Sequence, residues 1–282
     1  MSNTDTKTTF TIGGDLTINR LGYGAMRITG KGIWGEPENR EEAIKVLKRA
    51  VQLGVNFIDT ADSYGPNVSE ELIAEALYPY PEGLVIGTKG GLLRTGPDQW
   101  PVDASPEHLK EALDGSLKRL KLDKIDLYQL HRVDPKVPAE KTFEFLKQAQ
   151  QDGKIKHIGL SEVSVEDIKH AQQYFEVVSV QNMYSVDNRK WEGVLEYCKA
   201  NNIAFIPWYP LSGGNIHALE VLQKIADRHS ATPQQIALSW LLSHADNILL
   251  IPGTSKVAHL EQNLKANEIQ LSEEDFAELN KV

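Results

Sequence analysis

Eight short apolar segments alternate with longer amphipathic segments along the whole chain of 282 residues. Several of the apolar segments are rich in Val and Ile, and they do not alternate between apolar and polar side chains. Continuous apolar runs of this kind are typical of parallel strands that are buried on both faces. The expected strands cover residues 21–26, 56–60, 84–89, 124–131, 155–161, 177–182, 203–208 and 248–253.

The amphipathic segments predict helices. Apolar side chains recur every three or four residues from Ala43 to Val51, and Gly54 is placed to end that helix. Ser69 and Ser105 are expected to be N-caps, and Ser105 precedes a proline at the first helical position. The expected helices lie in residues 40–54, 69–77, 105–122, 138–153, 164–175, 189–202, 217–230 and 232–245.

Strands that alternate with helices form either a closed (β/α)8 barrel or a doubly wound open sheet. A nucleotide-binding open sheet should carry G-x-G-x-x-G after its first strand, but here Gly22 and Gly24 are not followed by a third glycine. The expected strands are evenly spaced and no linker separates them, which favours a single α/β domain over residues 1–282. We expect this domain to be a (β/α)8 TIM barrel with extra helices near the C-terminus. "TFTIGGDLTINR" (9–20) predicts a β-hairpin at the bottom of this barrel.

Composition narrows the classes of function. A formal net charge of −9 argues against a nucleic-acid-binding or membrane-surface protein, because both need clustered Lys and Arg. Cys198 is the single cysteine, no export signal opens the chain, and no apolar run approaches the roughly 20 residues of a membrane span. We therefore expect a cytoplasmic protein, a monomer or small homo-oligomer, that acts on a small molecule.

The active site of such a barrel lies at the C-terminal ends of its strands. Asp59, Lys89 and His131 end three consecutive expected strands, and Tyr64 follows Asp59 in the next loop. The ammonium of Lys89 would lower the pKa of the tyrosine, whose ordinary value is near 10, and Asp59 would hold the lysine. Each residue alone has a structural alternative, an ion pair or a packing aromatic. Their conjunction favours general acid catalysis on a carbonyl that His131 orients, and no cluster with the spacing of metal ligands is present.

These residues carry a family resemblance. "DTADSYG", "TKGG" and "LHRVD" resemble the catalytic tetrad of the aldo-keto reductases, and the similarity continues from "LGYGAMRITG" to "IPGTSKVAHLEQN". The resemblance implies a TIM barrel that binds NADPH across its strand ends and reduces an aldehyde or ketone to an alcohol. It also implies that Tyr64 donates the proton and that Asp59, Lys89 and His131 are its partners.

The same resemblance implies a set of cofactor contacts. Ser161 and Gln181 match residues that bind the nicotinamide carboxamide, and Trp208 takes the place of a tyrosine that stacks on the ring. His259 stands where many members carry an arginine, and a histidine cannot bind a phosphate through two parallel hydrogen bonds as an arginine does. The remaining implied contacts are Tyr209, Leu211 and Ser212 after the stacking residue, Gly253, Thr254, Ser255 and Lys256 around the 2′-phosphate, and Gln262 and Asn263 at the adenine.

Two departures from the family pattern bear on the site. Glu162 replaces the asparagine of a G-x-S-N motif, and an ionised carboxylate beside the nicotinamide would favour the oxidised cofactor; alternatively it faces solvent or pairs with a cation. The chain also ends without the long C-terminal loop of some members. The expected substrate walls are therefore the loops 30–37 and 94–101, with Trp34 and Trp100.

Two other functions remain open at this point. Channel-associated members keep the barrel and the cofactor, which makes a cofactor-sensing regulatory subunit the non-enzyme alternative. The enzymatic alternative is oxidation of an alcohol with NADP+. Some short reductases resemble pyridoxal reductases, which makes pyridoxal a candidate substrate.

Overall fold

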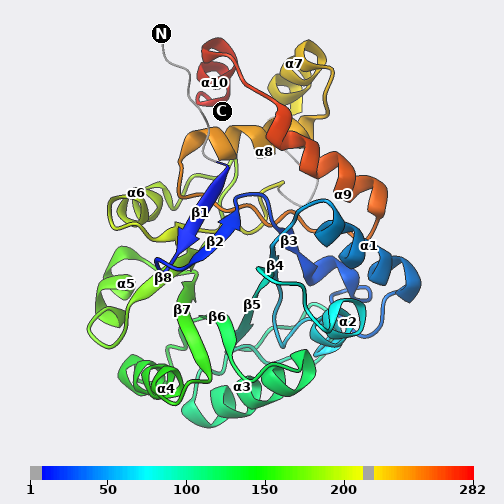
Figure 1. The fold of residues 1–282 in the computed structure, drawn as a ribbon. Coiled ribbons are helices and arrows are strands. Elements are labelled where there is room, and N and C mark those ends of the chain that lie inside the picture. The colour runs from blue at the N-terminus through cyan, green and yellow to red at the C-terminus, as the bar shows by residue number, and fades with distance from the viewer. Residues whose placement is uncertain (1–7, 212–218) are drawn as a thin grey trace.

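The computed structural model describes residues 8–211 and 219–282. Within these residues, parallel strands form one curled sheet with helices around its outside (Figure 1). Each strand pairs with the next one in the chain, as the βαβ pattern predicts. The strands of this sheet are β3 (Tyr23–Gly24), β4 (Phe57–Asp59), β5 (Val85–Gly90), β6 (Ile125–Leu130), β7 (Ile155–Ser161), β8 (Val177–Gln181) and β9 (Ala204–Phe205).

The eighth position of the barrel is filled by residues 248–251, a shorter segment than the predicted strand 248–253. Leu249 donates its backbone N–H to Phe205 of β9 over 2.8 Å, and Gly22 donates to Leu250 over the same distance. Parallel bridges at both contacts join this segment to β9 on one side and to the chain just before β3 on the other. The sheet thus closes on itself, which confirms the predicted barrel.

The predicted hairpin is also present. Strands β1 (Thr9–Ile12) and β2 (Leu16–Asn19) pair antiparallel, and the two glycines of the turn have φ of +58° and +80°, a conformation that disfavours other residues. Side chains of the hairpin pack against Phe57 and Val85, which begin β4 and β5. The hairpin therefore covers the N-terminal end of the barrel (Figure 1).

The helices lie on the outside of the sheet, and the helices near the C-terminus are confirmed. The predicted helix 217–230 begins outside the described residues, which contain it from Leu219 onward. None of the described helices is long and apolar enough to cross a membrane. The helices are α1 (Arg40–Gln52), α2 (Val68–Leu77), α3 (Pro106–Leu120), α4 (Ala139–Gln151), α5 (Val165–Ala171), α6 (Glu192–Ala200), α7 (Leu219–His229), α8 (Pro233–His244), α9 (Val257–Leu264) and α10 (Glu273–Leu279).

One predicted cap is confirmed and one is wrong. The hydroxyl of Ser105 accepts from the backbone N–H of His108 over 3.3 Å at the start of α3. Ser69, in contrast, lies inside the first turn of α2, whose N-cap is Asn67. The Ser69 hydroxyl is buried and bonds to Thr60 instead, over 2.8 Å. The helix thus begins earlier than predicted, at Val68, and the Ser69 hydroxyl joins α2 to the loop after β4.

Arg20 links the hairpin to the closing segment of the barrel. Its side chain is 1% exposed, and burial lowers the pKa of the guanidinium to about 10. Nε donates to the carbonyl of Ile248 over 2.9 Å, and Nη2 donates to the carbonyls of Leu242 and Ala245 over 2.9 and 2.5 Å. One side chain therefore satisfies the C-terminal carbonyls of α8 and the start of the eighth segment.

We predict that Arg20→Met lowers the free energy of unfolding by about 3–9 kcal/mol, because three buried carbonyls lose their donor at roughly 1–3 kcal/mol each. Urea unfolding midpoints measure the loss. The matched control is Arg49→Met, since Arg49 forms a half-exposed ion pair with Glu261. This pair should contribute less than about 1 kcal/mol. Equal midpoints for the two variants would contradict the role of Arg20.

Candidate active site

The four predicted catalytic side chains meet at the C-terminal edge of the sheet. Asp59 ends β4, Lys89 lies in β5, His131 follows β6, and Tyr64 lies in the loop after β4. The Lys89 Nζ donates to Asp59 Oδ2 over 2.7 Å, to the carbonyl of Thr60 over 2.7 Å and to the Tyr64 hydroxyl over 3.4 Å. These three acceptors use all three N–H groups of the ammonium.

The second carboxylate oxygen of Asp59 is held by two amides. Asp59 Oδ1 accepts from Gln129 Nε2 over 3.1 Å and from Gln181 Nε2 over 2.9 Å. Gln181 was predicted to bind a carboxamide, and the structure directs its amide nitrogen to Asp59. Gln129 was not predicted, although it lies two residues before His131 and therefore on the same face of β6.

Burial sets the protonation states of these groups. Burial lowers the pKa of Lys89, but the attraction of Asp59 and then of Tyr64 outweighs it and raises the pKa above its ordinary value. Burial raises the pKa of Tyr64, and Lys89 opposes this only in part. The expected net lowering of the tyrosine pKa is therefore wrong. Burial, then Lys89 and Arg132, holds the pKa of His131 well below 6.5, so its imidazole is neutral at pH 7.

His131 lies directly beside the phenol. The rings of His131 and Tyr64 meet edge to face with their centroids 5.9 Å apart. The imidazole Nδ1 is 3.4 Å from the hydroxyl of Ser63. A hydrogen-bonding imidazole and a protonated phenol thus stand side by side at the strand ends.

Arg132, which sequence reasoning missed, connects His131 to the predicted cofactor contacts. Its Nη1 donates to the carbonyl of His131 over 2.6 Å and to the hydroxyl of Ser161 over 3.0 Å. Its Cζ lies 5.7 Å from the centre of the Trp208 ring. The only signal in the sequence was its place directly after His131 in "LHRVD".

Glu162 lies beside the predicted stacking residue Trp208. Burial lowers the pKa of Arg132 and the charge of Glu162 opposes this, so the carboxylate interacts with a cation, as one of the two expectations held. Its Oε1 accepts from the indole Nε1 of Trp208 over 2.7 Å and from the backbone N–H of Met183 over 2.6 Å. Its φ is +54°, a left-handed conformation that asparagine adopts more readily than glutamate. The carboxylate thus fixes the position of the Trp208 indole.

The residues after Trp208 lie in different environments. Tyr209 is 42% exposed, and Leu211 packs against the main core. The predicted contact Ser212 lies outside the described residues.

The predicted phosphate and adenine contacts lie at the start of α9 and along it. Thr254 is buried, and its hydroxyl accepts from the backbone N–H of Lys256 over 3.1 Å. Glu42 of α1 was not predicted here, and its Oε1 accepts from the N–H of Val257 over 3.2 Å. No local sequence pattern could have shown this contact, because 215 residues separate the two. The exposed predicted contacts are Gly253, Ser255, Lys256, His259 and Gln262, whereas Asn263 is buried.

Both predicted substrate tryptophans lie near the phenol. The ring of Trp100 meets that of Tyr64 edge to face at 6.3 Å. The backbone of Trp34 pairs with that of Gly65, the residue after Tyr64, in an isolated parallel β-bridge. The guanidinium of Arg94 lies 3.6 Å from the centre of the Trp100 ring and 5.5 Å from that of Trp34. The structure therefore brings the loops 30–37 and 94–101 together beside Tyr64.

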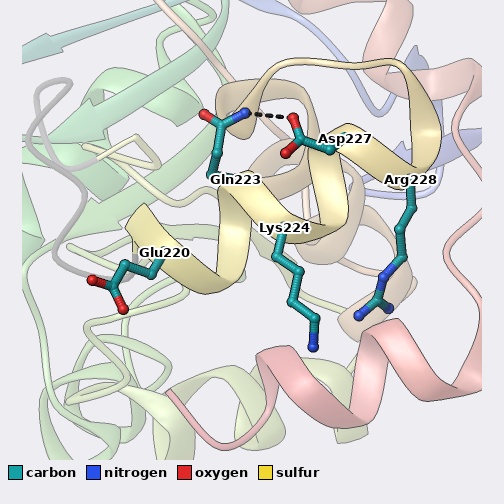
Figure 2. A pocket seen from close by; sticks show the side chains of 5 residues that line it. All are labelled: Glu220, Gln223, Lys224, Asp227 and Arg228. Atoms are coloured by element: carbon teal, nitrogen blue, oxygen red, sulfur yellow. Dashed lines mark hydrogen bonds between the residues drawn. The ribbon is translucent and has the colours of Figure 1, made fainter.

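A separate surface hollow of about 710 Å³ lies along α7, beside α10 (Figure 2). Charged side chains line it, and Lys224 and Arg228 pair there with Glu278. No residue of this lining belongs to the strand ends, so the hollow is distinct from the candidate active site.

Two buried acids, Asp62 and Glu70, lie in the loop after β4 and in α2. Burial, and then the neighbouring Glu70, raises the pKa of Asp62 to about 8. Glu70 itself is held by Thr88 over 2.6 Å and by Arg119 over 2.7 Å. Asp62 Oδ1 and the Tyr128 hydroxyl are buried and have no hydrogen-bond partner among the residues that the structure describes.

We predict that Asp62→Asn stabilises the protein more at pH 8 than at pH 5. The folded carboxyl keeps its proton up to about pH 8, whereas the unfolded one loses it near pH 3.8, so the wild type loses stability as pH rises between these values. The advantage of the variant should grow by a few kcal/mol over this window. Thermal unfolding at both pH values measures it, with the exposed Asp123→Asn as control. An advantage that does not change with pH would contradict the prediction.

Comparison with known proteins agrees with this geometry. Residues 20–282 match the Aldo/keto reductase family. An uncharacterized oxidoreductase of Schizosaccharomyces pombe is 55% identical over 271 residues, which cover 95% of this chain and 87% of that protein. The pyridoxine 4-dehydrogenase of Escherichia coli is 43% identical over 278 residues, which cover 96% of this chain and 97% of that protein.

Solved structures share the fold. The thermostable aldo-keto reductase Tm1743, solved with the inhibitor epalrestat, superposes with a TM-score of 0.86 at 33% identity. The match covers 97% of this chain and 98% of that one. A family match over nearly the whole chain, close relatives and a shared barrel all agree. The chain therefore belongs to the Aldo/keto reductase family and is an oxidoreductase of that family.

Proposed function

We propose that this protein reduces an aldehyde or ketone to an alcohol with NADPH and that Tyr64 donates the proton. The observation that carries the proposal is the Tyr64 hydroxyl 3.4 Å from an ammonium that is itself paired with a buried carboxylate. Relatives in the family bind NADP(H). Bound NADPH would supply the hydride.

The side chains of the tetrad would divide the work on the carbonyl oxygen. Tyr64 is protonated at neutral pH, because burial raises the pKa of its phenol, and it can therefore donate a hydrogen bond to that oxygen. As the proton leaves, the phenolate that forms is stabilised by Lys89, which Asp59 keeps in place. The neutral His131 would hold the carbonyl without a competing charge.

The groups at the strand ends fit a dinucleotide cofactor, at its nicotinamide end and at its phosphate. Trp208 offers a ring face fixed by Glu162, and Ser161 keeps its O–H free to donate because its oxygen accepts from Arg132. Lys256 stands at the N-terminus of α9, where no side chain of the cap residue occupies the helix N–H groups. The negative charge of Glu42 would repel a phosphate there, since its carboxylate lies at the same helix end.

Oxidation of an alcohol with NADP+ is the second candidate. The relative from Escherichia coli is a pyridoxine 4-dehydrogenase, a name that describes the oxidative direction. We propose pyridoxal and pyridoxine as the first substrate pair to test, because Trp100 places an aromatic surface beside Tyr64. The change in absorbance at 340 nm, followed in both directions of the reaction, decides between carbonyl reduction and alcohol oxidation. Tight binding of NADPH without turnover would instead favour a cofactor-sensing regulatory subunit.

We predict that Tyr64→Phe lowers kcat by about 10²–10⁴-fold, because only the transferable proton is lost. The dissociation constant for NADPH should stay nearly unchanged, and fluorescence titration measures it. Tyr197→Phe is the matched control, since among the described residues that hydroxyl bonds to Gln172 alone, on the exposed surface. A Tyr64→Phe enzyme with most of its activity would refute the assignment of the proton donor.

We predict opposite effects on cofactor choice from two charges at the α9 N-terminus. Lys256→Met should weaken NADPH binding by about 10–100-fold, through loss of a charged hydrogen bond to the 2′-phosphate. Glu42→Gln should strengthen it by about 5-fold, since an acceptor oxygen remains and the repulsive charge is removed. Calorimetry with NADPH and NADH measures both changes.

NADH affinity should change little in either variant, because NADH has no 2′-phosphate. Glu41→Gln, an exposed change on the same turn of α1, is the control for net charge. Equal losses of NADPH and NADH affinity in Lys256→Met would show that Lys256 does not contact the phosphate.

A further inference from the structure

The guanidinium of Arg94 joins three loops around Tyr64. Arg94 lies in the loop after β5 and donates only to backbone carbonyls. The acceptors are Gln99 for Nε at 3.0 Å, Ile33 and Ser63 for Nη1 at 2.5 and 2.8 Å, and Gly32 and Gly96 for Nη2 at 2.9 and 3.2 Å.

This set of contacts uses every donor that arginine has. A guanidinium carries five N–H groups in a fixed plane, and here five carbonyl oxygens receive them. Lysine has the same charge but only three donors on a single nitrogen, so it cannot replace this geometry. A negatively charged substrate finds no free N–H on Arg94, which excludes the simplest alternative role, direct binding of a substrate anion.

Backbone strain in the loop 30–37 points to the same contact. Ile33, a β-branched residue, has φ of +54°, a conformation that is costly for such a side chain. Strain of this kind persists only where the surroundings hold the backbone in place. The carbonyl of Ile33 accepts from Arg94, and its side chain packs in one cluster with Tyr64 and Trp100.

The flat face of the guanidinium also orients an aromatic ring. Arg94 lies 3.6 Å from the centre of the Trp100 ring, and the ring of Trp100 meets that of Tyr64 edge to face. The chain of contacts therefore runs from the loop 30–37 through Arg94 and Trp100 to the phenol.

We propose that Arg94 is a positioning residue that fixes Trp100 and the loop 30–37 as the wall of the substrate site and thereby favours aromatic over small aliphatic carbonyl substrates. The inference rests on the proposed function, since it takes Tyr64 as the residue beside the reacting carbonyl. A flat aromatic substrate needs the Trp100 face, whereas a short aliphatic aldehyde reaches Tyr64 without it.

Three variants test the proposal with benzaldehyde and propanal as probes. Arg94→Lys keeps the charge, Arg94→Met removes it, and Trp100→Leu removes the ring. All three should lower kcat/KM for benzaldehyde by about 10–100-fold, the usual result of a misplaced binding wall. The kcat/KM for propanal should fall by less than about 3-fold, and the dissociation constant for NADPH should change by less than about 2-fold. Arg49→Lys, in the half-exposed ion pair between α1 and α9, is the matched control.

Hydrogen exchange of the free protein gives a second readout that needs no turnover. Arg94→Lys should increase the exchange rates of backbone amides in all three segments that the guanidinium joins, residues 30–37, 63–65 and 94–101. If the wild type reduces neither aldehyde, the proposed function fails, and this exchange pattern still decides whether Arg94 holds the loops.

Three results would overturn the proposal. Wild-type behaviour of Arg94→Lys beside a defective Arg94→Met would mean that the charge acts and the five hydrogen bonds do not. Equal losses for benzaldehyde, propanal and NADPH binding would indicate general damage to the fold. Faster exchange confined to residues 94–101 would show that Arg94 orders only its own loop.

Discussion

The buried ion pair between Lys89 and Asp59 is the interaction on which the candidate site depends. Two charges inside a barrel are stable only if their remaining donors and acceptors are satisfied, because desolvation costs several kcal/mol per ion. Here the ammonium has three acceptors, and Asp59 accepts from Gln129 and Gln181 with its second oxygen. The pair thus connects β4, β5, β6 and β8, and its ammonium donates to the Tyr64 hydroxyl. Removal of any one partner would leave a buried group unpaired.

Much of this arrangement was predictable from the sequence, because it follows from short-range periodicity. Continuous apolar runs predicted parallel strands, and the rule that barrel sites lie at strand ends brought Asp59, Lys89 and His131 together. Alternation along a strand also accounts for Gln129, since it shares a face with Leu127 in the barrel interior and with His131 at the rim. The turn at Gly13 and Gly14 and the cap at Ser105 are equally local features, and both were correct.

What could not be predicted depends on contacts between distant segments. Arg94 donates to backbone carbonyls, and because every residue has one, the sequence does not show which of them an arginine contacts. Ser69 has the composition of a cap, but a tertiary bond to Thr60 uses its hydroxyl. Glu162 and Trp208 each looked like an isolated departure from the family pattern, yet the carboxylate accepts from the indole N–H, so the two substitutions form one unit. Burial, likewise, outweighs Lys89 in setting the pKa of Tyr64, and its extent is known only from the fold.

The bonds of Arg20 have a consequence for synthesis on the ribosome. Its acceptors lie 222 to 228 residues further along the chain, so the barrel cannot close until nearly all of the protein has been made. At translation rates of about 5–20 residues per second, the N-terminal hairpin and the first strands wait roughly ten to fifty seconds for their partners. During that time an apolar sheet edge is unpaired, and such edges associate with other chains. We expect nascent chains of this protein to need chaperones most just before residues 242–250 emerge from the exit tunnel.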